Sequence, residues 1–495
     1  MNLKFLKIAV ALSGVVAISS CKKTMDINYD PDRIPDTNSP IAQLLTSAQV
    51  NIGFTGGSDL FRYTTLIMQQ MSGQASQPNQ TYDYYRYNIT GSDQNNVWLS
   101  IFATTLSDLE LILKQGTASP HYLGVAKILK AFTYHQVVDV WGDVPYTDAQ
   151  QLTANTAPKY DDDATIYPKL ITLLTEAVTD LNAANSVLSP GTNSTFYSNA
   201  SWATARPFWI KLANTLRLRL LLHYSKIDPT FTVNQITALV NSGATFMASN
   251  ADNFQHPFYA VANQRNPISA FEVSRPNYIF ADKRMLDLMV PKADPRLPFY
   301  FTDFPVGSGL YVGVSATAPP AAPNNNYSRV HSFLRGTVTT PPAGSASGVY
   351  NGAAPQRLLT FAEYNFIRAE AALMGAPGNA QTFFEAGITA SMQEAGVAAP
   401  AIATYLAAHG TLVGTNAQKL QQIIEQKYIA LFGVPTEQWT DYRRTGYPVL
   451  SVPSNVINTV SAVPRALFYP QTEIDLNPNA PAQRAANLQD GPFWD

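Results

Sequence analysis

Apolar residues recur at steps of three and four along most of the chain, which is the spacing of one helix face. The run Asp161–Asp163 precedes one such stripe and suits the positive end of a helix better than a metal site. The stripe consists of Ile166, Leu170, Leu173, Leu174, Ala177 and Leu181. The same spacing predicts helices over residues 41–52, 58–71, 97–114, 122–139, 202–225, 361–374, 379–395 and 416–432. We therefore expect an all-α body of paired helices with few short strands.

Small residues mark places where two predicted helices would pack closely. One helix carries Ala362, Ala369, Ala371 and Ala372. Beyond the turn at Gly375–Gly378, the partner helix carries Phe383 and Gly387. Small side chains that receive a bulky one are typical of tetratricopeptide units, although the Trp, Leu, Gly and Tyr markers of that repeat's first helix are missing. We expect tetratricopeptide-like pairs that stack into an α–α superhelix.

Residues 291–360 interrupt the helical pattern with ten prolines and seven glycines. Aromatic residues in this stretch, among them Tyr311, Tyr327 and Phe333, argue against plain disorder, because disordered chains contain few of them. A long irregular stretch inside a compact protein is usually functional when it is ordered. We expect an ordered excursion with short strands, and a loop-rich ligand region over about residues 245–360.

The first 20 residues have the features of a bacterial lipoprotein signal peptide. Two lysines precede the apolar run Ile8–Ile18, which is too short to span a hydrocarbon core of about 30 Å. The segment Ile18–Cys21 resembles a lipobox, with an aliphatic residue, two small residues and the only cysteine. We expect cleavage before Cys21, a diacylglycerol thioether on its sulfur, and an extended polar tether over residues 21–40. Ordinary cleavage that leaves a free thiol is the alternative.

Charge and aromatic content narrow the class of ligand. Charged residues make up 14% of the chain and aromatic residues 11%, with 33 Lys and Arg against 35 Asp and Glu. Neutral polar and aromatic side chains must cover much of the surface, which suits a neutral ligand. No basic block is present to displace counterions from phosphates, which argues against nucleic acid as a partner. The single cysteine excludes an internal disulfide and thiolate metal clusters.

The motifs of common enzymes are missing from the sequence. The six histidines include no pair at ligand spacing and no His-Glu-x-x-His motif, so we expect no metal and no cofactor. No Gly-Lys dipeptide occurs, which excludes the common phosphate-binding loop. A glycoside hydrolase stays an open alternative, because its two catalytic carboxylates come together only in the folded chain. The sequence therefore favours a binding function.

Amide and aromatic side chains concentrate between residues 69 and 102. A sugar presents an apolar C–H face and a ring of hydroxyls, so aromatic rings and side-chain amides complement it. The candidate ligand-binding residues, here and in the Pro-rich excursion, are Tyr82, Tyr84, Tyr85, Tyr87, Asn95, Trp98, Tyr311 and Tyr327. The alternative is that these tyrosines pack the loop onto the body, and Trp98 favours the core more than the others.

Short motifs follow one another in a fixed order along nearly the whole chain. They are Met25–Pro31, the GDVPY turn Gly142–Tyr146, Asp294–Pro298 with Tyr311–Gly313, Phe361–Ala371, Glu425–Phe432, Trp439–Pro448 and the closing Pro464–Asn479. Each motif alone is weak. Together and in this order they resemble the SusD/RagB family, the surface nutrient-binding lipoproteins of Bacteroidota.

The resemblance implies an all-α fold over residues 41–495, in which tetratricopeptide-like helix pairs support a loop-rich ligand half. It also implies a lipoprotein of the outer membrane that faces the cell exterior, touches the membrane only through its lipid, and has no catalytic activity. Family members capture oligosaccharides, and in some cases peptides, and pass them to a SusC-like TonB-dependent transporter. The GDVPY, AEA and YRRTGYP residues are structural in this interpretation. A peptide-binding member and a surface glycoside hydrolase are the alternatives.

Overall fold

The computed structural model describes residues 40–73, 80–151, 154–320, 324–344, 348–457 and 460–495. Ile41–Asp495 is a unit of its own, made of paired helices and a loop-rich half. The predicted signal peptide, the lipid attachment residue Cys21 and residues 21–39 of the predicted tether lie outside the described residues.

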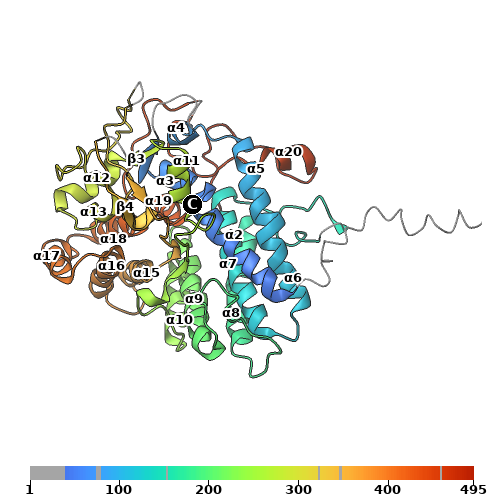
Figure 1. Ribbon diagram of the computed structural model, residues 1–495. Coiled ribbons are helices and arrows are strands. Elements are labelled where there is room, and N and C mark those ends of the chain that lie inside the picture. The colour runs from blue at the N-terminus through green and yellow to red at the C-terminus, as the bar shows by residue number, and fades with distance from the viewer. Residues whose placement is uncertain (1–39, 74–79, 152–153, 321–323, 345–347, 458–459) are drawn as a thin grey trace, which may run out of the picture. The chain divides into compact units, whose positions relative to one another are not determined.

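Helices make up most of the first half of this unit (Figure 1). They are α2 (Ile41–Gly57), α3 (Asp59–Ile67), α4 (Gln80–Tyr85), α5 (Gly91–Leu99), the π-helix η2 (Ser100–Leu106), α6 (Ser107–Gln115), α7 (Pro120–Trp141), α8 (Asp163–Leu181), α9 (Trp202–His223), α10 (Pro229–Asn241) and the 3-10 helix η4 (Asn250–Asp252). The all-α prediction is confirmed.

Short helices come first in the second half, and long ones return after residue 360. They are α11 (Pro267–Ser274), α12 (Lys283–Met289), the 3-10 helix η5 (Val290–Lys292), α13 (Leu297–Tyr300), α14 (Ser332–Arg335), α15 (Phe361–Met374), α16 (Ala380–Ala395), α17 (Ala399–His409), α18 (Asn416–Ala430), α19 (Glu437–Thr445) and α20 (Gln471–Leu476).

Side-chain caps explain where the long helices begin. Helix α8 starts after Asp162, whose carboxylate accepts a hydrogen bond from the Thr165 amide, 3.2 Å away. Helix α15 starts after Thr360, whose hydroxyl accepts from the Glu363 amide over 3.2 Å. Its last turn closes on Gly375, at φ 110°, which only glycine adopts readily. The acidic run before α8 is thus a cap, as predicted.

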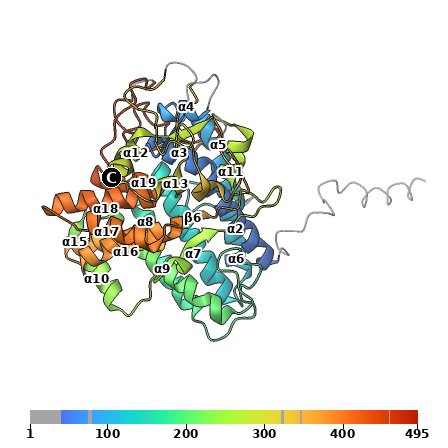
Figure 2. The same cartoon turned by 60° about the vertical axis from the view of Figure 1, so that its left-hand side comes forward.

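Neighbouring helices pack as pairs through small residues. Helix α7 packs against α8, α8 against α9, and α15 against both α16 and α18 (Figure 2). At the α15–α16 contact, a Cβ atom on Gly387 would lie 2.8 Å from the Phe366 ring. A larger side chain at this position would push the two helices apart. Here the small residue lies on α16 and the bulky ring on α15, the reverse of the predicted arrangement.

The stretch predicted as one helix over residues 97–114 is interrupted by the π-helix η2. The Asn51 side chain of α2 inserts here: its Nδ2 donates to the Ser100 carbonyl over 2.8 Å and to Thr105 Oγ1 over 2.6 Å. A side chain that captures a helix carbonyl disturbs the regular hydrogen-bond ladder, which is a known cause of such bulges. The apolar periodicity of residues 97–114 does not reveal the contact with Asn51.

The strands are short and form three antiparallel pairs. They are β1 (Met71–Gly73) with β3 (Ile279–Ala281), β2 (Phe254–His256) with β6 (Gln356–Leu359), and β4 (Val338–Thr340) with β5 (Val349–Tyr350). Three of these strands, β4, β5 and β6, lie in the Pro-rich excursion. The prediction of an ordered excursion with short strands is confirmed over the described part of residues 291–360.

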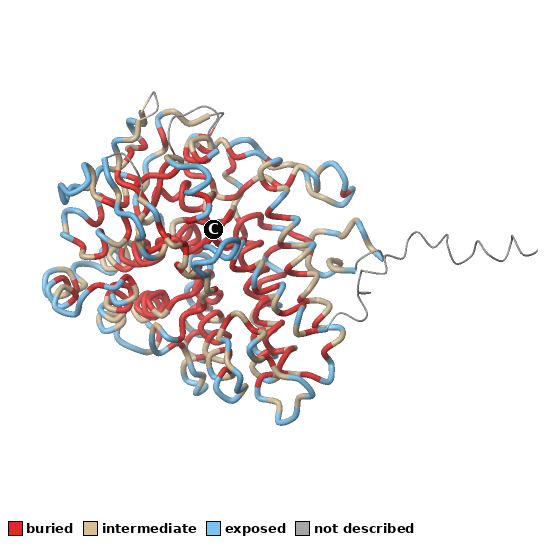
Figure 3. Tube along the Cα trace, viewed as in Figure 1, coloured by how far each residue is buried: buried red, intermediate tan, exposed pale blue. Residues whose placement is uncertain are grey.

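Buried residues follow the surfaces where helices meet (Figure 3). Helix α7 is buried on nearly all sides, which fits its apolar character around the whole circumference. It therefore carries even its polar residues His135 and Asp139 into the interior, where both are 0% exposed.

Candidate ligand-binding site

Strand β1 and helix α4 lie against the loop-rich half, and α4 carries the predicted tyrosines. Strand β1 pairs with β3, so that Gly73 lies opposite Ile279. A Cβ atom on Gly73 would lie 2.2 Å from the Thr81 carbonyl oxygen, so only glycine permits this approach. The Thr81 hydroxyl donates to the Tyr278 carbonyl over 2.6 Å, joining residues 197 positions apart.

Two of the predicted ligand-binding tyrosines are buried in the body. Tyr85 is 0% exposed and Tyr87 is 2% exposed. The Tyr85 hydroxyl donates to an oxygen of Asp282 over 2.9 Å. Burial raises the pKa of both phenols, so they remain protonated at neutral pH. Their ring faces meet protein instead of solvent, which corresponds to the packing alternative.

Tyr84 is also buried, but its hydroxyl organises polar side chains at the surface. The ring packs against Tyr63, with centroids 4.9 Å apart. The hydroxyl donates to Asp93 Oδ1 over 3.1 Å and accepts from Gln80 Nε2 over 2.7 Å. Burial first, and then the Asp93 carboxylate, raises the pKa of Tyr84. The protonated phenol thereby holds Gln80 and Asp93 in place.

These three residues border a polar hollow of about 480 Å³. Its lining consists of Gln80, Asp83, Tyr84, Asn88, Thr90, Asp93, Arg275 and Tyr278. Amides, carboxylates, a hydroxyl, a guanidinium and phenols converge here, so the hollow offers both donors and acceptors, as sugar hydroxyls require. Its volume falls in the range of about 300 to 1,000 Å³ that is common for small-molecule sites.

Arg275 and Tyr278 are lining residues that sequence reasoning missed. Both belong to the irregular segment between α11 and β3. The Arg275 guanidinium lies 5.3 Å from the centroid of Phe271, and the Tyr278 ring meets the same ring edge-on at 6.1 Å. The β1–β3 pairing and the Thr81–Tyr278 hydrogen bond place this segment beside α4. The one available signal was its position inside the predicted ligand region of about residues 245–360.

Tyr82 lies on the other side of α4 and is partly exposed. Asn455 Nδ2 donates to the Tyr82 hydroxyl over 2.8 Å. The Arg86 guanidinium lies 4.8 Å from the Tyr82 ring centroid and also pairs with Asp83 over 2.5 Å. Asn455 belongs to the segment after α19, so a third part of the chain reaches the predicted region.

Tyr311 and Tyr327 both lie in the excursion and are partly exposed. The Tyr327 ring packs against Phe280 at 5.7 Å, in a small cluster that also contains Tyr85. Tyr311 packs against the main core. A backbone hydrogen bond from the Ser328 amide to the Val312 carbonyl, 2.8 Å long, joins the two segments. The structure therefore places Tyr327 next to the α4 tyrosines.

Asn95 and Trp98 lie apart from this region. Trp98 is 5% exposed and stacks on Phe102, with ring centroids 4.2 Å apart, as the core alternative predicts. Asn95 Oδ1 accepts hydrogen bonds from the amide and the hydroxyl of Thr472, 3.1 and 3.2 Å away. Neither residue lines the polar hollow.

A second hollow, of about 760 Å³, lies among α9, α10, α15, α18 and α19 and touches none of the predicted site residues. Leu373, Met374 and Leu420 contribute apolar surface to it. Its charged groups Arg444 and Glu370 pair with each other at 2.8 Å, and its third charged group, Lys226, pairs with Asp495 at 3.0 Å. Paired charges leave little free hydrogen-bonding capacity for a polar ligand, so the smaller polar hollow is the better candidate for a sugar.

The sequence model of a family described as starch-binding and associating with the outer membrane matches residues 32–470. The chain belongs to the SusD-like family. A solved structure of a chitin-binding protein is 26% identical, has a TM-score of 0.73, and is matched over 89% of this chain and 95% of its own. A chitin-binding SusD homologue from Flavobacterium johnsoniae is 22% identical, with a TM-score of 0.73 and coverage of 91% and 98%.

A further SusD homologue, from Bacteroides fragilis, is 24% identical, with a TM-score of 0.70 and coverage of 88% and 94%. No curated protein matches the chain in sequence. The predicted resemblance to the SusD/RagB family is confirmed by the family match and by the shared fold.

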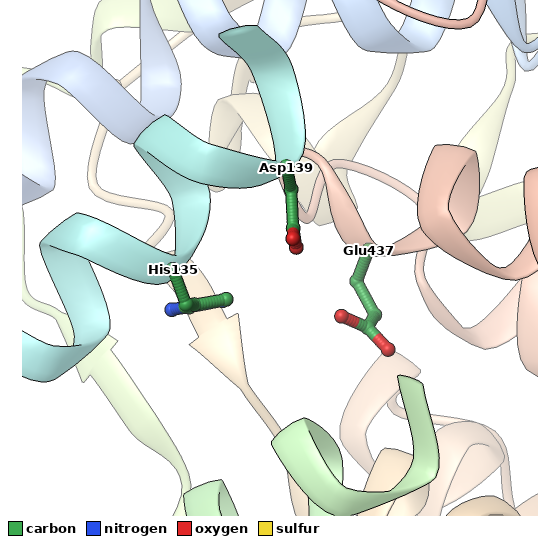
Figure 4. Close-up of side chains that lie close together, drawn as sticks. All are labelled: His135, Asp139 and Glu437. Atoms are coloured by element: carbon green, nitrogen blue, oxygen red, sulfur yellow. The ribbon is translucent and has the colours of Figure 1, made fainter. Parts of the chain in front are cut away.

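The recurring motifs of this SusD-like chain meet in a buried group of polar side chains. His135 and Asp139 project from α7 and Glu437 from α19, and the three face a common space (Figure 4). One donor atom from each lies within 4.8 Å of the others. This spacing would allow the three donors to bind a metal ion. Whether they fit one depends on the other charged groups around them.

Cations of the protein itself already surround these donors. Lys427 Nζ lies 3.0 Å and Arg219 Nε 3.4 Å from the two carboxylate oxygens of Glu437. Arg219 Nη1 also lies 3.3 Å from His135 Nε2. Burial alone would raise the pKa of Glu437, but Lys427, His223 and Arg219 bring it well below its usual range. This donor set does not fit a divalent cation, because two fixed cations already neutralise it.

Buried ion pairs also connect the helices that carry the AEA and YRRTGYP motifs. Glu363 of α15 pairs with Arg219 of α9 at 2.7 Å, and Glu370 pairs with Arg444 at 2.8 Å. Arg443 Nη1 donates to the Asp139 carbonyl over 2.6 Å. These contacts give a physical reason for regarding the AEA and YRRTGYP residues as structural, since they hold α7, α9, α15 and α19 together.

Proposed function

We propose that this chain is a surface-exposed outer-membrane lipoprotein that binds an oligosaccharide and delivers it to a SusC-like TonB-dependent transporter. The observation that carries the binding proposal is the polar hollow, where α4, the start of α5 and the segment before β3 converge. Family membership and the likeness to a chitin-binding protein at 26% identity support a glycan as the ligand. Cys21 carries the lipid in this proposal.

The lining of the hollow suits an acetamido sugar. The carboxylates of Asp83 and Asp93 accept hydrogen bonds from hydroxyls and from the acetamido N–H, and the Arg275 guanidinium donates to the acetamido carbonyl. The partly buried Tyr278 ring offers apolar surface to C–H groups. Tyr82, Tyr311 and Tyr327 are partly exposed and could contact further units of a longer oligomer.

The two carboxylates of the hollow are better placed for holding a ligand than for proton transfer. Asp93 Oδ2 accepts from the Thr90 amide over 2.8 Å, and its Oδ1 accepts from Tyr84 over 3.1 Å. Asp83 is paired with Arg86. These hydrogen bonds and the ion pair hold both carboxylates in fixed orientations, in which they can act as acceptors for a ligand. This arrangement supports a binding protein.

Isothermal titration of the full mature chain against a panel of neutral glycans tests this proposal. N-acetylglucosamine oligomers of two to six units come first, with cellulose, starch and xylan oligomers and a set of short peptides as comparisons. We expect saturable binding of at least one oligosaccharide, with no release of new reducing ends. Binding of peptides alone would support the peptide-binding alternative, and cleavage of a bound glycan would support the hydrolase.

A further inference from the structure

Another hollow, with a partly aromatic lining, lies at the far end of α5 from the polar hollow. Its volume is about 370 Å³, within the range that is common for small-molecule sites. Trp98, Leu99 and Phe102 line it from α5 and η2, and Pro145 and Pro158 line it from the segment between α7 and α8. We call it the aromatic hollow.

Helix α5 separates the aromatic hollow from the polar hollow. Asp93, in the first turn of α5, lines the polar hollow, and Trp98, in its last turn, lines the aromatic hollow. Five residues of α-helix correspond to roughly 7.5 Å along the axis and about 140° around it, so the two side chains leave the helix on different faces. In Figure 1, α4 at the polar hollow and α20 at the aromatic hollow lie on opposite sides of α5. The two hollows have no lining residue in common and are distinct places on the protein.

The π-helix η2 shapes the helical side of the aromatic hollow. Phe102 and Ala103 both belong to η2, and both line the hollow. Phe102 stacks on Trp98, with ring centroids 4.2 Å apart, and remains partly exposed, while Ala103 is exposed. π-Helical turns are rare in proteins and occur frequently at functional sites. In this chain the π-helix places an accessible aromatic ring in a hollow.

The loop side of the aromatic hollow is held in place by Gln150. This residue has a φ of 62°, which non-glycine residues adopt rarely. Its Nε2 donates to the Phe102 carbonyl over 2.9 Å, and its own carbonyl oxygen accepts from Lys114 Nζ over 3.1 Å. Residues in sparsely populated backbone conformations cluster at active sites and ligand clamps. A direct hydrogen bond thus joins the loop to the π-helix and preorganises the hollow for a ligand.

The free polar groups of the aromatic hollow are mostly neutral. Gln151 and Thr156 line it, and neither side chain has a hydrogen-bond partner among the described residues. Glu473 is the one charged residue among the described residues of the lining. Its Oε2 accepts from the Tyr160 hydroxyl over 3.1 Å and from Asn477 Nδ2 over 3.3 Å, which leaves Oε1 as an acceptor. An amide, a hydroxyl and a carboxylate oxygen beside an aromatic ring complement the hydroxyls and the C–H face of a sugar.

Two other classes of ligand fit the aromatic hollow less well. A purely apolar ligand would cover the polar groups of Gln151 and Glu473 without hydrogen bonds, which costs free energy for each group. A phosphorylated or carboxylated ligand would find no cation to pair with, because the described residues of the lining include no Lys, Arg or His. The Glu473 carboxylate would also repel such a ligand. A neutral glycan avoids both difficulties.

We propose that the aromatic hollow is a second carbohydrate-binding site, which binds part of a neutral glycan independently of the polar hollow. The proposal rests on the proposed function, which supplies the class of ligand. Two sites on one chain raise the avidity for a glycan polymer that occupies both, even when each site alone binds weakly. The second site therefore favours the capture of long glycans over short oligomers.

Photo-cross-linking and mass spectrometry of the full mature chain test the two hollows separately. The probes are the hexamers of N-acetylglucosamine and of glucose, each carrying a diazirine that forms a covalent adduct with nearby residues on irradiation. We expect at least one of these probes to give two separate sets of adducts. The first set lies in residues 80–93 and 275–278, at the polar hollow, and the second set in residues 98–107 and 145–151, at the aromatic hollow.

Variants of lining residues assign the second set of adducts to the aromatic hollow. Ala103→Trp fills the hollow from an exposed position, so it should lower the yield of the second set at least tenfold and change the first less than twofold. Gln151→Ala removes a side chain that supports no other described residue, and it should lower the second set at least threefold. Tyr278→Ala should lower the first set only. The control Ala407→Trp, exposed on α17, should change neither set.

Two outcomes would overturn the second site and leave the proposed function intact. One is that adducts form only at the polar hollow. The other is that adducts in residues 98–107 persist in Ala103→Trp, which would mean that the probe reaches the outer surface of the helix instead of the hollow. Adducts at neither hollow would also overturn the second site. Isothermal titration of the same hexamers and the wider glycan panel then decides the proposed function, which fails if no glycan binds.

Discussion

The Tyr85 hydroxyl donates to a carboxyl oxygen of Asp282 over 2.9 Å, and neither side chain is more than 1% exposed. The contact ties α4 to the start of α12, where Asp282 Oδ1 also accepts from the Arg284 amide over 2.7 Å. Burial raises the pKa of Asp282 to about 8, against the lowering effect of these two donors. Tyr85, which was predicted to contact the ligand, thus anchors α4 to the body through Asp282.

Asp282 should make stability depend on pH. Because its pKa rises from 3.8 to about 8 on folding, the folded chain holds this proton more tightly than the unfolded chain. The resulting stabilisation is complete below about pH 4 and is lost as the pH rises through about 8. Urea titration measures the free energy of unfolding of Asp282→Asn and of the unchanged chain. We expect the value for the variant to rise relative to that of the unchanged chain as the pH increases from about 4 to about 8.

The exposed Asp475 provides the control for this measurement. Asp475→Asn should leave the difference from the unchanged chain nearly constant between pH 4 and 8. A difference for Asp282→Asn that is equally flat would show that its carboxyl has an ordinary pKa in the folded chain.

Removal of the Tyr85 hydroxyl should weaken the fold without changing affinity for the ligand. Tyr85→Phe leaves one oxygen of a buried carboxyl without its donor, which costs about 1 to 3 kcal/mol. Because the Tyr85 ring has no exposed face, glycan affinity should change less than twofold. Chemical denaturation and isothermal titration measure the two effects. A large loss of affinity in a folded variant would mean that Tyr85 contacts the ligand directly.

Lys427 should be among the most sensitive positions for stability. It is 0% exposed and lies 3.0 Å from Glu437 and 2.8 Å from Asp441. Lys427→Met removes a cation that two buried carboxylates share, and loss of one partner of a buried ion pair costs about 3 to 5 kcal/mol. Lys283→Met, which removes a surface pair with Asp287, should cost less than about 1 kcal/mol. Equal costs, measured by denaturant unfolding, would contradict the structural role of the network.

The lipid anchor can be tested independently of the fold. We expect Cys21→Ala to move the protein from the outer-membrane fraction to the soluble fraction and to abolish incorporation of radiolabelled palmitate. The chain should otherwise fold and bind its ligand, since Cys21 lies outside the unit Ile41–Asp495. An unmodified Cys21 in the N-terminal peptide of the unchanged protein, measured by mass spectrometry, would support ordinary signal-peptide cleavage instead.

Helices were predictable from sequence because their periodicity and caps are local. The expected span 361–374 agrees with α15, and the expected span 379–395 differs from α16 by one residue. The interruption at η2 was not predictable, because Asn51 of another helix causes it. The burial of Tyr84, Tyr85 and Tyr87 was not predictable, since alternating tyrosines look alike in a sequence whether they face solvent or core.

The site as a whole depends on contacts between distant segments. Arg275 and Tyr278 lie beside the hollow because β1 pairs with β3, two strands of three residues each. Strands this short leave almost no pattern of alternation in a sequence. The long helices, in contrast, contain enough residues for a period to be recognised.

The affinity of site variants for a glycan that binds the unchanged chain tests the central claim most directly. Isothermal titration would compare Tyr278→Ala and Arg275→Ala, in the polar hollow, with Asn234→Ala, in the larger hollow between helices. Loss of an aromatic contact worth about 1 to 3 kcal/mol predicts a dissociation constant roughly 5- to 150-fold higher for Tyr278→Ala, and a similar rise for Arg275→Ala. Asn234→Ala should bind as the unchanged chain does. Unchanged affinity in both polar-hollow variants, with a loss in Asn234→Ala, would contradict the account.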